Sequence, residues 1–68
     1  MSERYEYVEA IVCEGELRWK YRVKGLAAGS DACDEDVSSW TDEEIRDLTR
    51  RLLNVNQDQR ELIEVIWK

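Results

Sequence analysis

The chain has 68 residues, of which 10 are Lys or Arg and 16 are Asp or Glu, so its formal net charge is −6. This length allows a single domain, 1–68, whose one small core supplies only about 3–5 kcal/mol of stability. Hydrophobic residues make up 43% of the chain and charged residues 38%. This composition excludes both a disordered tail and a membrane span.

The residue inventory excludes most familiar catalytic and metal-binding sites. The chain has no His, and therefore neither an imidazole base nor a His metal ligand. Cys13 and Cys33 lack the close spacing of a redox or zinc pair, and the three glycines are too scattered for a phosphate-binding loop. We therefore expect no enzymatic activity, no cofactor and no metal site.

The first residues contain no apolar segment of the kind that directs export. We therefore expect a cytoplasmic protein. In that reducing compartment Cys13 and Cys33 would be free thiols, and a single disulfide between them is the alternative.

Residues 4–24 carry the pattern of a β-hairpin. Apolar and basic residues alternate without a break from Leu17 to Lys24, as in a strand with one buried face. The segment 5–12 is rich in aromatic and β-branched residues, and Glu14-Gly15 fits a two-residue turn. This turn predicts Val12–Leu17, Ala10–Trp19, Val8–Tyr21 and Glu6–Val23 on the core face, and Ile11–Arg18, Glu9–Lys20, Tyr7–Arg22 and Tyr5–Lys24 on the other.

Residues 25–40 have no periodicity and predict a mobile acidic loop. Gly25 and Gly29 interrupt any regular pattern, and no basic residue occurs between Asp31 and Glu44. A solvated loop accounts for most of these acids, but they also form a candidate docking surface for a basic partner. This surface comprises Asp31, Asp34, Glu35, Asp36, Asp42 and Glu43.

A helix is predicted over 42–53. Thr41 and Glu44 have the spacing of a capping box, and Ile45, Leu48 and Leu52 form one apolar stripe. Acids in the first turn and arginines in the last complement the helix dipole. Asn54 is the expected stop of this helix.

The last segment, 57–67, fits either a strand or a second helix. We expect a strand from about Leu62, because an isolated hairpin is marginal in water and a third strand would complete a sheet. The fold is then a small ββαβ domain of the α+β class, with ββαα as the alternative. A three-stranded antiparallel or mixed sheet, in the order 2-1-3, would carry one helix on one face. A right-handed crossover would make its last strand parallel to the second.

One helix leaves the other sheet face uncovered, and this face is the candidate interaction surface. In the simpler interpretation the face is solvated and its basic side chains lie over the aromatic rings. In the functional interpretation it is the interface of a homodimer. The last strand would add Leu62 and Ile66 to this face. The predicted surface comprises Tyr5, Tyr7, Ile11, Arg18, Lys20, Arg22 and Lys24.

We therefore expect a small intracellular interaction or regulatory module without chemistry of its own. Its expected partners are a second copy of the chain and, through the acidic loop, a basic protein. The alternative function is a nucleic-acid-binding module that uses the basic and aromatic face, which the net charge of −6 opposes. No membrane contact is expected.

Overall fold

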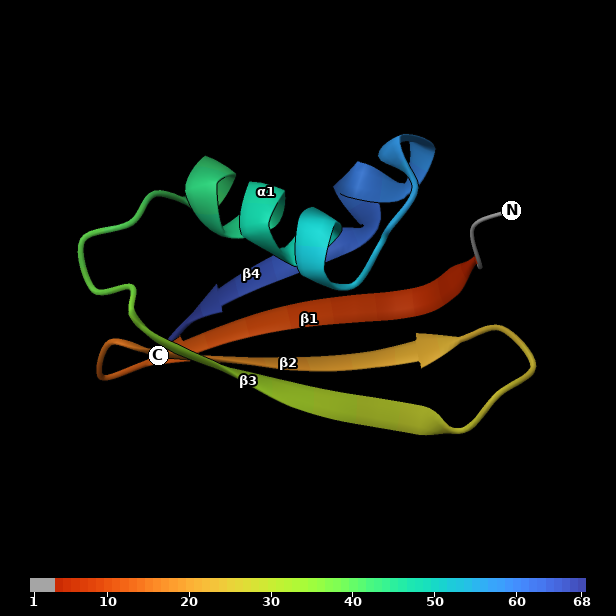
Figure 1. Ribbon diagram of the computed structural model, residues 1–68, viewed down its shortest axis with the longest axis horizontal. Coiled ribbons are helices and arrows are strands. Elements are labelled where there is room, and N and C mark those ends of the chain that lie inside the picture. Colours follow the sequence, from red (N-terminus) through yellow and green to blue (C-terminus); the bar gives the residue numbers. More distant parts are fainter. Residues whose placement is uncertain (1–3) are drawn as a thin grey trace.

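The computed structural model describes residues 4–68 and shows a small α+β domain (Figure 1). Four strands form one mixed sheet in the order β3-β2-β1-β4, accompanied by one α-helix and one short 3-10 helix. In chain order the elements are β1 (Tyr5–Cys13), β2 (Glu16–Val23), β3 (Ala28–Asp36), α1 (Asp42–Leu52), the 3-10 helix η1 (Gln57–Leu62) and β4 (Ile63–Trp67).

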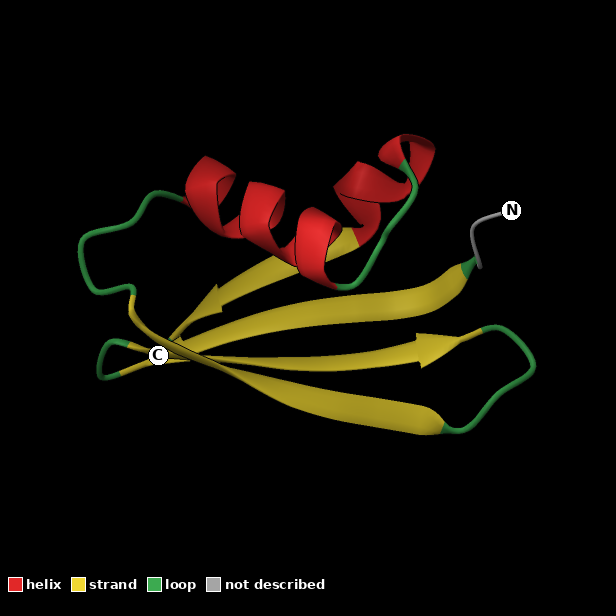
Figure 2. Ribbon diagram, in the orientation of Figure 1, coloured by secondary structure: helices red, strands yellow, loops and turns green. Residues whose placement is uncertain are grey.

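Both helices lie on the same face of the sheet (Figure 2). The core fills the space between this face and α1, and Trp19 and Ile45 are among its fully enclosed side chains. The indole Nε1 of Trp19 donates a 2.7 Å hydrogen bond to Oγ1 of Thr49, which donates in turn to the Ile45 carbonyl. The buried hydrophobic residues are Val8, Ala10, Val12, Leu17, Trp19, Val37, Ile45, Val55 and Ile63.

The predicted hairpin is confirmed over most of its length. Glu14 and Gly15 both have positive φ, 52° and 79°, as a two-residue type I′ turn requires. Six of the eight expected pairs form, from Val12 opposite Leu17 to Tyr7 opposite Arg22. Trp19 therefore lies in the core, as its position in the alternation predicts.

The register shifts between Tyr5 and Tyr7, so Tyr5 pairs with Val23. The expected pairs of Glu6 with Val23 and of Tyr5 with Lys24 are therefore wrong. The cause lies far along the chain, because the Gln59 side chain hydrogen-bonds both the backbone N–H and the carbonyl of Tyr5, each at 3.1 Å.

The expected loop over 25–40 is wrong for its central part, which forms the edge strand β3. Tyr21 pairs with Gly29 and Trp19 with Asp31, and the pairing is irregular near Glu16. A Cβ atom on Gly29 would lie 2.6 Å from Cε1 of Tyr21, so glycine lets this ring lie over the strand. Backbone pairing with β2 orders a segment whose own side chains bury little surface.

The extra strand also changes the topology. The predicted order 2-1-3 survives as the neighbours β2, β1 and β4, but β3 is added outside β2 and makes β2 an internal strand. β4 is a strand, as expected, and the alternative ββαα fold is wrong. β4 runs parallel to β1 rather than to β2, because β3 reverses the direction in which the chain enters the helix.

The helix begins where its capping signal predicts. Thr41 is the N-cap, its hydroxyl accepts from the Glu44 N–H at 3.3 Å, and the Glu44 carboxylate accepts from the Thr41 N–H at 2.9 Å. The helix ends at Leu52, and Asn54 takes the positive φ of 54° expected of a residue that follows a helix. Within residues 4–68 neither helical segment is long and apolar enough to span a membrane.

Candidate functional site

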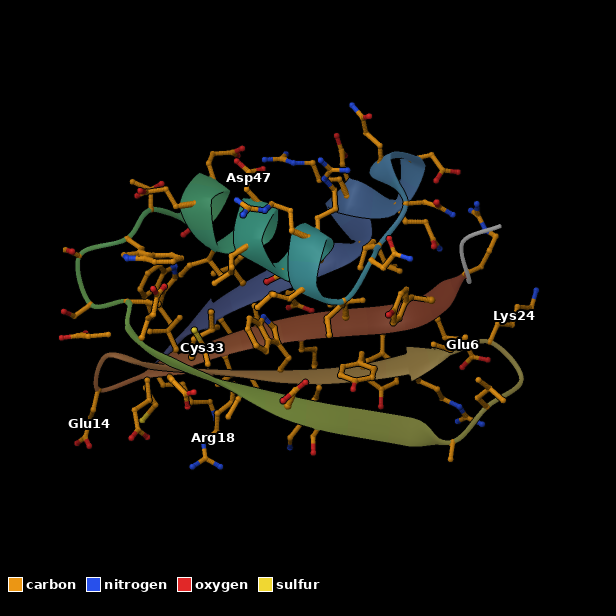
Figure 3. The ribbon with its side chains drawn as sticks, viewed as in Figure 1. Glu6, Glu14, Arg18, Lys24, Cys33 and Asp47 are labelled. Atoms are coloured by element: carbon orange, nitrogen blue, oxygen red, sulfur yellow. The ribbon has the colours of Figure 1, made fainter. Side chains whose placement is uncertain are left out.

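The sheet face opposite α1 carries no covering element among residues 4–68 (Figure 1). We call it the open face. In Figure 3 the Arg18 side chain projects from it, away from the helices, whereas Cys33 lies on the helix side. The strand alternation and register place on it Tyr7, Glu9, Ile11, Cys13, Glu16, Arg18, Lys20, Arg22, Ala28, Ser30, Ala32, Glu64 and Ile66.

The open face is ordered in rows that cross the sheet. One row runs from Ser30 through Lys20 and Glu9 to Glu64. The adjacent row runs from Ala32 through Arg18 and Ile11 to Ile66. The three cations Arg18, Lys20 and Arg22 stand on β2, which also carries Glu16 at its hairpin end, whereas Glu9 and Glu64 stand on β1 and β4. Most of the positive charge therefore lies on one strand, and acids lie on the strands beside it.

The apolar part of the open face is small and extends from β1 to the edge strand β4. Ile11 and Ile66 are direct neighbours on parallel strands, and both are half-buried. Tyr7 on the same face is 37% exposed. Leu62, which was expected here, is also 37% exposed but belongs to η1 rather than to β4.

The residues of the predicted interaction surface lie together on the open face, except at its ends. Tyr5 is a correction, because the register shift turns it toward the core, where its ring packs edge-on against Tyr21 with centroids 6.0 Å apart. Its hydroxyl donates to the Leu53 carbonyl. Lys24 lies in the turn beyond the end of β2, at the right-hand end of the sheet in Figure 3.

Few side chains of the open face are paired with one another. Nε of Arg22 lies 3.6 Å from a carboxylate oxygen of Glu6, and both side chains are well exposed. Within the described residues, the side chains of Arg18, Lys20 and Glu9 form neither a hydrogen bond nor an ion pair. These three charged groups are therefore free to meet groups from another molecule.

The structure divides the predicted acidic docking surface between β3 and the start of α1. Asp31, Asp34, Glu35 and Asp36 are exposed on β3, the edge strand of the sheet. The Asp36 carboxylate accepts from the Ser38 N–H at 2.9 Å, and this bond holds the pKa of Asp36 below its usual value. Part of the acidic surface thus closes the turn that leads to the helix.

The remaining predicted acids also make contacts within the chain. Oδ1 of Asp42 accepts a hydrogen bond from the Trp67 indole at 2.5 Å. Glu43 accepts from Arg60 and lies 3.8 Å from Arg46. Both acids therefore connect α1 to the C-terminal part of the chain.

An ionic cluster on the helix side was not predicted from the sequence. Arg60 donates to Glu43 and, at 3.2 Å, to Asp47, and these two acids raise the pKa of its guanidinium. Figure 3 shows Asp47 on the outward surface of α1, away from the sheet. In the sequence Asp47 lies 13 positions and Glu43 lies 17 positions before Arg60. No local spacing rule links them, and the cluster ties η1 to α1.

The described residues show no arrangement that would hold a metal ion. No three His, Cys, Asp or Glu side chains between residues 4 and 68 converge. Cys13 and Cys33 are free thiols; Cys33 packs against the core from the helix side, whereas Cys13 is exposed. No protein-family model, curated protein or solved structure matches this chain.

Proposed function

We propose that this protein is an interaction module that assembles as a homodimer through its open face. The observation that carries the proposal is the uncovered face of a four-stranded sheet, with Tyr7, Ile11 and Ile66 at its surface and unpaired charges beside them. A sheet normally buries at least one face and often both, and a small chain gains most from covering the second.

The size of the open face supports a dimer of modest affinity. Four strands spaced about 4.8 Å apart, which together average about eight residues of about 3.3 Å although β4 has only five, give roughly 500 Å² per copy. Two copies would bury about 1,000 Å², which is near the lower limit for a specific interface. Because the charged side chains must also lose part of their hydration, we expect association in the micromolar range.

Sedimentation velocity from low to high micromolar concentration tests the proposal. The wild-type chain should change from monomer to dimer, and Tyr7→Ala with Ile11→Ala should weaken the dimer at least about tenfold while the monomer stays folded. The matched control removes exposed apolar side chains that lie outside the open face. It replaces Leu26 and Leu52, which are 55% and 59% exposed and lie off the open face, with Ala.

Two results would contradict the homodimer. A wild-type chain that stays monomeric at high micromolar concentration has no self-association for the open face to explain. If the control substitutions weaken the dimer as much as the Tyr7 and Ile11 substitutions do, the dimer forms through another surface. Circular dichroism of each variant as a monomer separates loss of assembly from loss of folding.

A second candidate, docking of a basic protein segment, is favoured by the position of the acids on β3. An edge strand offers unpaired backbone groups to an extended peptide, and exposed carboxylates would select basic side chains. Titration with an extended Lys-rich peptide, followed by backbone amide shifts of β3, tests this candidate. Shifts that map elsewhere, or no binding at low salt, would remove it.

A nucleic acid on the open face is the remaining alternative. The three cations of β2 and Tyr7 would contact phosphates and bases, but a chain with a net charge of −6 repels a polyanion at long range. A mobility shift with single-stranded oligonucleotides at low salt, abolished by Arg18→Glu, would favour this function over the homodimer.

A further inference from the structure

We infer that the two copies are related by a two-fold axis that runs along the strands between β1 and β2, so that Lys20 of each copy faces Glu9 of the other. This inference rests on the proposed homodimer and specifies its geometry. It follows from the arrangement of charge on the open face together with the order of the strands.

Strand order decides which strand lies over which. Sheets packed face to face keep their strands nearly aligned, so the axis of a symmetric pair runs either along the strands or across them. An axis across the strands places every strand over its own copy, whatever the offset. Arg18 and Lys20 would then lie against cations of β2 in the second copy, and Glu16 at the hairpin end is the one acid that this strand offers. Like charges at an interface oppose association.

An axis along the strands places each strand over a different strand of the second copy. In the order β3-β2-β1-β4 the centre of the sheet lies between β2 and β1. A two-fold axis at this centre places β2 over β1 of the second copy and β3 over its β4. Among axes that run along the strands, this position is also the one that overlaps the two open faces most completely. The position of greatest buried area and the position of opposite charge therefore coincide.

The rows of the sheet then predict which side chains meet. Lys20 and Glu9 share a row, so each Lys20 lies over Glu9 of the second copy. Arg22 lies over Tyr7 by the same rule, which is the arrangement of a cation against an aromatic ring. Packed sheets are about 10 Å apart and rotated by about 30°, so the central row is the one least displaced by the twist.

The side chains of this central row are available. Lys20 is exposed, Glu9 is partly exposed, and within residues 4–68 the two side chains form no ion pair. A Lys and a Glu side chain that extend toward each other can together bridge a gap of about 10 Å between sheets. At the edges of the face, Ala32 would lie over Ile66 of the second copy, a small residue over a larger apolar one.

Charge reversal tests the pairing by sedimentation. Lys20→Glu alone gives two Glu–Glu contacts per dimer, and Glu9→Lys alone gives two Lys–Lys contacts. Each variant should therefore dimerise about tenfold or more weakly than the wild type. An equimolar mixture of the two variants restores both opposite-charge contacts and should form a heterodimer about as tight as the wild-type dimer. Lys24→Glu and Glu61→Lys, which change the same charges off the open face, serve as controls.

The double variant Lys20→Glu with Glu9→Lys guards against simple unfolding. It also restores the cross-strand pair within each chain, so it should fold and dimerise as the wild type does even where a single variant is unstable. Failure of both the double variant and the mixture to dimerise would overturn the pairing.

Cross-linking identifies the axis itself, with Cys13 and Cys33 replaced by Ser. A short bismaleimide should join an Arg18→Cys chain to an Ile11→Cys chain, because these positions share a row. An axis across the strands would join Arg18→Cys to Arg22→Cys instead, and this product would overturn the inference while leaving the homodimer intact. A wild-type chain that is monomeric throughout would overturn the homodimer as well.

Discussion

The hydrogen bond between Trp19 and Thr49 makes the most exacting test of the core. Thr49 is completely buried and Trp19 is 2% exposed, so no water can replace either partner. Thr49→Val keeps the shape of the side chain and removes the acceptor. The indole N–H is then buried without a partner, which costs about 1–3 kcal/mol. For a chain whose total stability is about 3–5 kcal/mol, this loss is large.

Urea denaturation followed by circular dichroism, at one protein concentration, measures this loss. The same replacement in a Trp19→Phe background should cost less than about 0.5 kcal/mol, because both polar groups are then absent. The double-mutant cycle should therefore give a coupling energy of about 1 kcal/mol or more. Thr49→Ser, which keeps the hydroxyl, should lose only about 0.8 kcal/mol for its methyl group.

Equal losses in the two backgrounds would refute this reasoning. They would show that Thr49 contributes only its volume, and that the indole nitrogen does not depend on the hydroxyl. A Thr49→Val chain as stable as the wild type would have the same meaning.

Three further outcomes are expected. Trp19→Ala should cost about 3–5 kcal/mol and unfold the domain, which loss of the circular dichroism signal would show. Gly29→Ala should lower the free energy of unfolding by about 1–3 kcal/mol, because its Cβ would lie 2.6 Å from the Tyr21 ring; an unchanged melting temperature would contradict this packing. The Ser38 N–H lowers the pKa of Asp36 in the folded chain. The stabilisation that this provides is fully present above the unfolded pKa of about 3.9, and it is lost as pH falls through the folded pKa. Asp36→Asn should therefore reduce the loss of stability in acid, as measured by thermal melts from neutral pH to below about pH 4.

The parts of the fold that could be predicted are those in which one face of an element is buried. Alternation from Leu17 to Lys24 fixed the register of the hairpin, and it also identified Arg18 and Lys20 as outward-facing. The capping box at Thr41 fixed the start of the helix. In each case the signal lies within a few residues of the feature that it determines.

The missed features depend on residues that are distant in the sequence. β3 shows no alternation because α1 leaves most of it uncovered, and only Gly29 and Cys33 of its residues are partly buried. The turn of Tyr5 toward the core depends on the side chain of Gln59, 54 positions away. Gly29 and Cys33 are spaced so that both fall on one face of a strand. This spacing, soon after the basic strand in the sequence, is the one local signal that could have indicated β3.

The parallel pairing of β1 with β4 has a consequence for how the chain folds. Val8 pairs with Ile63, so two adjacent strands come from opposite ends of the described chain. The β1–β2–β3 meander can form early, because its contacts are between neighbours in sequence. The core closes only when the last strand has been synthesised and docked beside β1. Until then the free edge of β1 stays open to pairing with other chains. Because this long-range parallel pairing is expected to form slowly, the step that protects the edge of β1 comes late in folding.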